Sequence, residues 1–289
     1  MLPESKISLY KGRSVSQCIE ASFDFMRTCR RVCIRAACVS LYPVSLVMGI
    51  MAVCFRQLDE SSELEDRLLS WSDNHPVLFY VLLALGTWMS LSMVFSLLIA
   101  YEEKGPTIER FSRHDLWPYM LQCLRRSWWI ALIISFIVSF FIHRTTALLV
   151  LLGLLLTVIF STLPSVVLIG RHPLPQAFFK SGRYGFLSFF HSLFTMGFTL
   201  FFGLMMILSF VMPASFLSYV CFEVLGFELS DRPSMLLNIL GAIFISLLYF
   251  AFFVVLSMVF MASAYHYGSV SERVDDASLS SDIDHFDQL

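Results

Sequence analysis

Two long stretches of this 289-residue sequence lack charged residues altogether. No Asp, Glu, Lys or Arg lies between Arg183 and Glu223, and none lies between Arg232 and Glu272. Each stretch exceeds the roughly 20 residues that an α-helix needs to cross a bilayer. Pumps, proton relays and intramembrane enzymes usually place ionisable groups inside the membrane, so the absence of such groups argues against these classes of protein.

Sequence signatures of catalysis and of metal binding are also missing. The chain has no GxSxG or HExxH motif, and its seven cysteines contain no CxxC pair. A nucleophile would need a base within reach, and a zinc site would need regularly spaced ligands. We therefore expect a protein without enzymatic activity, cofactor or metal. The first ten residues, MLPESKISLY, have no apolar core, so a cleaved signal peptide is not expected either.

Apolar residues dominate what is present. The AVILMFWYC class makes up 57% of the chain and charged residues only 15%, which is typical of a membrane protein. The apolar runs, cut at their flanking charges, predict an all-α, polytopic fold with six transmembrane helices, at 34–55, 76–101, 127–142, 146–169, 187–212 and 234–264. These spans form one integral membrane domain, 1–268. Residues 269–289 are acidic and serine-rich, and we predict a disordered cytoplasmic tail there.

Lysine and arginine are divided unevenly between the two sides of these spans. Only four of them fall in the connections assigned to the outer side: Arg56, Arg67, Arg144 and Arg232. The others, apart from Arg273 in the tail, precede or begin the first span or lie between spans two and three or four and five. By the positive-inside rule, both termini are predicted to face the cytoplasm.

An amphipathic segment precedes each pair of spans, which predicts three units that each consist of a cytoplasmic elbow helix and a helical hairpin. The third elbow covers 173–185. Such helices lie at the lipid headgroup boundary, where they either anchor the following span or gather anionic lipid. The apolar faces of the first two elbows comprise Val15, Ile19, Phe23 and Met26, and Trp117, Leu121, Leu124 and Trp128.

Small and hydroxyl-bearing residues recur about every four positions in the fourth and fifth predicted spans. Such stripes let helices approach closely, or they line a cavity for a lipid or small solute; both interpretations stay open. Pro164 is the best candidate for a helix break. The stripes and this proline comprise Gly153, Thr157, Ser161, Pro164, Ser165, Ser188, Ser192, Thr195, Thr199 and Gly203.

Three segments give the chain a resemblance to a known family: VSQCIEASFDFMRTCRRVC before the first span, YEEKGPTIERFSRHDLWPYMLQCLRR between the second and third, and HPLPQAFFKSGRYGFLSFF entering the fifth. They are similar to six-span bacterial inner-membrane proteins related to the membrane domain found with some glycerophosphoryl diester phosphodiesterases. The resemblance implies a fold and a location in the bacterial inner (plasma) membrane. It implies no phosphodiesterase activity, because that chemistry belongs to a separate soluble barrel that this chain lacks.

Together these observations predict a structural or accessory subunit of a membrane complex. The expected partners are membrane lipid and another membrane protein or a second copy of the chain, and no nucleic acid. The alternative is the binding or transport of a lipid-like or apolar small molecule, with a cavity between the fourth and fifth spans.

Overall fold

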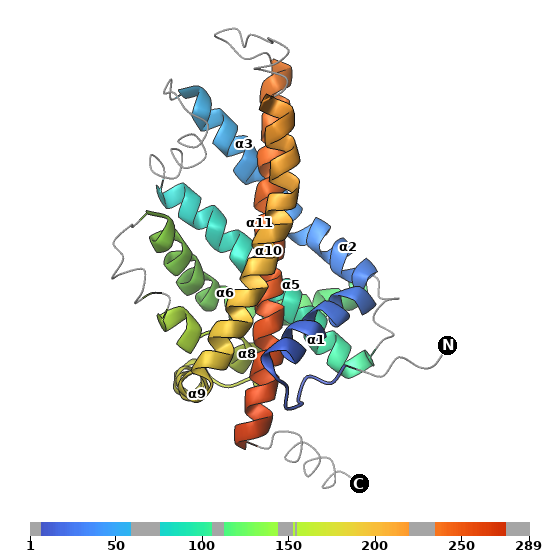
Figure 1. Cartoon of the computed structure of the whole chain (residues 1–289), viewed down its shortest axis with the longest axis vertical. Helices are drawn as coiled ribbons and strands as arrows, with labels where there is room; N and C mark the ends of the chain where they lie inside the picture. Colours follow the sequence, from blue (N-terminus) through green and yellow to red (C-terminus); the bar gives the residue numbers. More distant parts are fainter. Residues whose placement is uncertain are drawn as a thin grey trace.

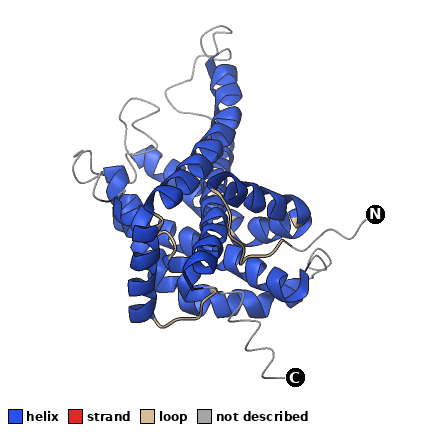
Figure 2. Ribbon diagram, turned by 60° about the horizontal axis from the view of Figure 1, so that its bottom comes forward, coloured by secondary structure: helices blue, strands red, loops and turns tan. Residues whose placement is uncertain are grey.

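The structure is a computed structural model that describes residues 7–58, 76–105, 113–143, 153, 155–219 and 235–275. All regular secondary structure in these residues is helical (Figure 2). The helices are α1 (Val15–Thr28), α2 (Arg30–Ser40), α3 (Tyr42–Leu58), α5 (Pro76–Lys104), α6 (Arg113–His143), α8 (Leu163–Leu168), α9 (Leu174–Leu187), α10 (Phe189–Tyr219) and α11 (Met235–Asp275).

Four of these helices are long and apolar enough to cross a membrane: α5, α6, α10 and α11. Helices α2 and α3 add a fifth candidate if they form one span, which bends by 42° between Ser40 and Tyr42. Pro43 explains the bend, because it has no N–H for the carbonyl of Val39 and its ring clashes with that carbonyl. The chain is therefore a membrane-embedded, multi-pass protein.

The fourth predicted span, 146–169, is the one for which the structure gives the least support. Part of it lies outside the described residues, and the described part is a short apolar segment, Leu155–Leu168. A turn at Phe160–Thr162 interrupts this segment, and α8 starts after it with Pro164 in its first turn. A count of six spans stays a prediction.

Two further boundaries differ from those predicted. Residues of the second elbow and the third span form one continuous helix, α6, so this elbow is not a separate element. Helix α11 continues to Asp275, and Ser269 is fully buried in it, although 269–275 was expected to belong to a disordered tail. The rest of the expected tail lies outside the described residues.

Helix α11 is the central element of the fold. It runs along the long axis of the molecule and packs against α1, α3, α5, α8, α9 and α10 (Figure 1). Where it crosses α5, Gly86 stands against the buried ring of Phe253, and a Cβ at Gly86 would come within 2.0 Å of that ring. The two helices thus approach closely because one contributes no side chain.

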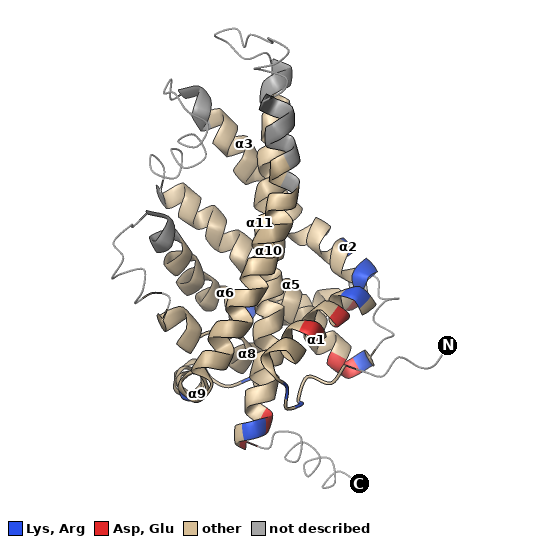
Figure 3. Cartoon of the chain, in the orientation of Figure 1, with Lys and Arg blue, Asp and Glu red and all other residues tan. Residues whose placement is uncertain are grey.

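Charged side chains gather at one end of the molecule. In Figure 3 they cluster around α1, the start of α2 and the end of α11, whereas the described upper parts of α3, α10 and α11 are free of them. Such a division matches a bundle with one end at a charged interface and the other end in hydrocarbon.

Candidate functional site

The segment predicted to be the first elbow forms a separate helix, α1, but its predicted apolar face is not the face that is buried. Its start is fixed by a capping box, in which the Gln17 N–H donates to Ser14 Oγ and the Ser14 N–H donates to Gln17 Oε1. The residues that face the protein interior are Cys18, Ala21, Ser22 and Phe25. Val15, Ile19 and Met26 are half-buried, and Phe23 is exposed beside Phe202 of α10.

The predicted apolar face of the second elbow has four residues. Leu124 is half-buried, and the other three are exposed. Trp117, Leu121 and Trp128 lie on the outer surface of α6. Large apolar side chains on the outside of a membrane helix are in contact with lipid or with a partner, so this placement fits both predicted roles of the elbows.

The two hydroxyl stripes meet where the segment before α8 packs on α10. Ser161 Oγ and Ser192 Oγ are 2.6 Å apart, and Thr162 Oγ1 and Ser181 Oγ are 3.0 Å apart. Ser263 of α11 donates to the Ser161 carbonyl at 2.6 Å, which brings a third helix to the same point. The stripes are thus partly used to join three segments that lie far apart in the sequence.

The remaining stripe residues act within their own helices or against an apolar neighbour. Thr157, Ser188, Thr195 and Thr199 each donate to the carbonyl four residues earlier, and Gly153 supplies that carbonyl for Thr157. Gly203 leaves room for the Val255 side chain, which a Cβ would meet at 2.4 Å. Ser165 is fully buried, and its hydroxyl has no hydrogen-bond partner among the described residues.

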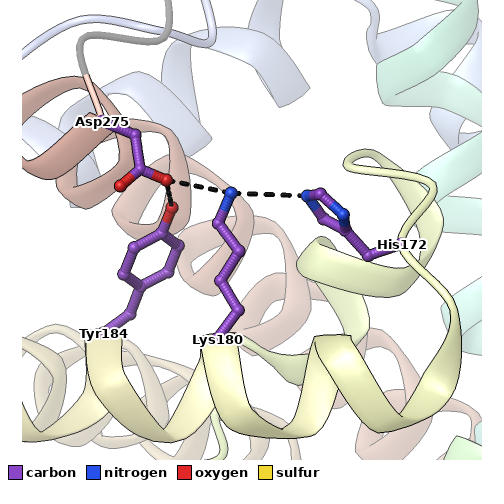
Figure 4. Close-up of polar contacts among 4 residues, drawn as sticks. All are labelled: His172, Lys180, Tyr184 and Asp275. Carbon is purple, nitrogen blue, oxygen red and sulfur yellow. Dashed lines mark hydrogen bonds and ion pairs between the residues drawn. The ribbon is translucent and has the colours of Figure 1, made fainter.

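A polar cluster connects α9 to the end of α11. Lys180 Nζ lies 2.9 Å from Asp275 Oδ2, and the Tyr184 hydroxyl donates to the same oxygen (Figure 4). Lys180 also lies 3.3 Å from His172 Nε2, which accepts because the lysine has only protons to offer. Desolvation by burial, followed by the hydrogen bond to Asp275, raises the pKa of the Tyr184 phenol above its ordinary value, so Tyr184 remains a donor near neutral pH.

His172 makes this cluster sensitive to acid. Burial, followed by the positive charge of Lys180, lowers the pKa of His172 below its ordinary value of 6.5. The unfolded chain then binds this proton more readily than the folded chain. The contribution of neutral His172 to the stability of the fold is therefore complete above about pH 6.5 and declines as the pH falls below it.

We expect the apparent melting temperature of His172→Gln to fall less between pH 7.5 and 5.5 than that of the native chain, as measured by scanning fluorimetry in detergent. An equal loss in both proteins would contradict this role.

Residues 7–14 form a second connection, a strap across the end of α11. Arg13 is buried, its guanidinium donates to the carbonyls of Ser8 and Leu9, and it lies 5.2 Å from the centre of the Tyr265 ring. Its main-chain N–H donates to Ser269 Oγ at 2.9 Å, and Ser269 Oγ in turn donates to its carbonyl at 3.1 Å. The strap and α9 thus attach to the same end of α11. Sequence reasoning missed both attachments.

Two histidines also come together near this end. The rings of His191 (α10) and His266 (α11) have centroids 4.7 Å apart. The Ser188 hydroxyl donates to the Tyr184 carbonyl, so it accepts from His266 Nε2 at 3.2 Å, which places the proton of a neutral His266 on Nε2. Across the described ranges no group of three or more His, Cys, Asp or Glu side chains is arranged to hold a metal ion.

The thiol of Cys18 is an unsuitable nucleophile. It is fully buried on the inner face of α1, and desolvation by this burial raises its pKa to about 11. The thiol is therefore protonated at neutral pH, whereas the thiolate is the reactive form. Among the described cysteines, all thiols are free.

Helix α10 presents two contrasting faces. Its inner face carries the buried residues Ser192, Thr195, Thr199 and Gly203. In the most apolar 18 residues of α10 only 22% are buried inside the protein, whereas the corresponding part of α5 is 72% buried. The outer face, at helical spacing, comprises the exposed residues Phe190, Phe194, Gly197, Phe201, Leu204 and Leu208.

Gly197 interrupts this outer face. It is exposed, and a Cβ at this position would meet nothing within 4 Å. Other glycines of the spans, such as Gly86 and Gly203, make room for a neighbouring side chain of the same molecule. Within the described part of the molecule no such neighbour explains Gly197. It forms a notch between Phe194 and Phe201.

A groove of about 600 Å³ lies elsewhere, on the outer surface of α5 and α6. Its lining includes Ala84 and Trp88 of α5, and Leu121, Arg125, Trp128 and Leu132 of α6. From the sequence, a possible ligand cavity was placed between the fourth and fifth predicted spans, so this groove is a different site.

No family model, curated protein or solved structure matches the chain. The family resemblance therefore stays a prediction.

Proposed function

We propose that this chain is a non-enzymatic accessory subunit that binds a transmembrane helix of another membrane protein, or of a second copy of itself, on the outer face of α10. The location that we propose is the bacterial inner membrane, with both termini in the cytoplasm. The single observation that carries the proposal is the Gly197 notch between two exposed phenylalanines.

Two physical arguments support this proposal. Transmembrane helices associate by close van der Waals packing, and their interfaces are enriched in small residues that let backbones approach. A glycine in the middle of a helix is less favourable than alanine by about 1 kcal/mol, so lipid contact alone gives no reason for it. Phe194 and Phe201 on either side supply large, rigid surfaces that pack against a partner helix.

Photo-crosslinking from Phe201 tests the proposal. With p-benzoylphenylalanine in place of Phe201, we expect illumination of native membranes to give one discrete protein adduct, whose mass identifies a partner or a dimer. The same probe at Phe136, an exposed residue of α6, should give no such adduct. Adducts with lipid alone from position 201 would refute the proposal.

Gly197→Leu provides the matching mutational test. A leucine fills the notch and blocks close approach, so the yield of the adduct should fall about tenfold, which corresponds to an overpacking cost within the usual 1–3 kcal/mol. Gly241→Leu is the control, because Gly241 of α11 also has nothing within 4 Å of its Cβ position. If both substitutions reduce the adduct equally, the notch has no specific role.

A further inference from the structure

The groove between α5 and α6 is apolar along its length and carries a cation at one point. The indole N–H of Trp88 donates to the carbonyl of Leu124 at 2.9 Å, so the polar atom of this side chain is already satisfied. Arg125 is the charged residue in the lining. The groove thus suits a ligand with a long apolar chain and an anionic end.

Arg125 is available to such a ligand. Its side chain is exposed, and in the described ranges it has no ion pair or hydrogen bond. Arg126, the next residue, is exposed as well but does not line the groove. A guanidinium offers a planar fork of donors that binds phosphate oxygens in a bidentate manner.

The position of Arg125 along α6 fits the headgroup level of a bilayer. From Ser127 to His143 the helix carries no Asp, Glu, Lys or Arg, and at 1.5 Å per residue this stretch is about 26 Å long, near the hydrocarbon thickness of about 30 Å. Trp128 and Trp129 lie at the start of this stretch, with stacked rings whose centroids are 3.9 Å apart. Tryptophans are enriched at the membrane interface, so both features place the cation beside lipid phosphates.

We propose that the groove binds one anionic phospholipid of the bilayer, with an acyl chain between α5 and α6 and its phosphate on Arg125. This site is separate from the outer face of α10, so its test requires no protein partner.

Quenching of tryptophan fluorescence by brominated lipids tests this site, because Trp88 and Trp128 both line the groove. The purified full chain is reconstituted into phosphatidylcholine vesicles that contain rising fractions of brominated phosphatidylglycerol or brominated phosphatidylcholine. We expect the anionic lipid to quench with an apparent relative affinity about fivefold higher, as one basic side chain near a lipid phosphate provides.

Arg125→Gln should reduce this preference to about one, whereas Arg126→Gln should leave it unchanged. Both arginines are exposed, so neither substitution removes a buried contact, and melting curves in detergent verify folding. Native mass spectrometry of the native chain should show one retained phosphatidylglycerol, which Arg125→Gln loses. Equal quenching by the two lipids, or an equal effect of the two substitutions, would overturn the proposal.

Discussion

Gly86→Ala is expected to destabilise the protein strongly. The added methyl group would lie 2.0 Å from the ring of Phe253, which is fully buried at the crossing of α5 and α11. Overpacking of this kind costs about 1–3 kcal/mol, and occasionally more when the ring cannot move. The measurement is the unfolding free energy or apparent melting temperature in detergent.

A second substitution makes the test specific to this contact. Phe253→Leu alone leaves a cavity and lowers stability, but in combination with Gly86→Ala the smaller side chain makes room for the methyl group. The double variant should therefore be more stable than the sum of the two single effects predicts. Gly241→Ala is the control, because that site is open. Additive effects would show that the close approach of α5 and α11 is not the cause.

Arg13→Ala is expected to loosen the strap of residues 7–14 where it crosses α11. The substitution removes a buried guanidinium that donates to the Ser8 and Leu9 carbonyls within the strap and lies over the Tyr265 ring of α11. Hydrogen bonds to charged groups contribute about 1.5–3 kcal/mol each, so a loss of about 3–6 kcal/mol is expected for the two bonds. Hydrogen exchange of the amides in 7–14 and at the end of α11 measures the loosening directly.

Arg27→Ala is the matched control, since Arg27 is an exposed arginine of the adjacent helix α1. It should change neither hydrogen exchange nor the melting temperature by more than the error. Arg13→Lys should behave like Arg13→Ala, because an ammonium lacks the planar fork that reaches both carbonyls. Full protection of 7–14 in Arg13→Ala would show that Ser269 and Arg273, which bond the main chain of residue 13, hold the strap without the guanidinium.

Length and charge predicted the helical membrane class. Apolar runs free of charge have few structural solutions in a bilayer, because every backbone N–H and C=O there must be satisfied within the segment. The runs at 76–101 and 187–212 accordingly overlap α5 and α10. The run at 146–169 contains Pro164 and several hydroxyls, and the described part of it is short and interrupted.

Periodicity was less informative about which face of a helix is buried. Val15, Ile19 and Phe23 were predicted to form the apolar stripe of α1, yet Cys18, Ala21, Ser22 and Phe25 face the interior. In a membrane protein the lipid is as apolar as the core, so hydrophobicity does not distinguish an outward face from an inward one. Small residue size marks the inner face of α10 at Thr195, Thr199 and Gly203, but not that of α1, where Phe25 is buried.

The sequence by itself determined that this is a helical protein of the bilayer, where its apolar runs lie and which residues are small enough to join helices. Only the tertiary structure decided that Lys180 meets Asp275, that Arg13 lies over Tyr265, and that Gly197 and Arg125 face outward without a partner in the described residues. The physical reason is that local pattern fixes a helix, whereas contacts between residues far apart in sequence depend on how helices cross and rotate, which no single segment encodes.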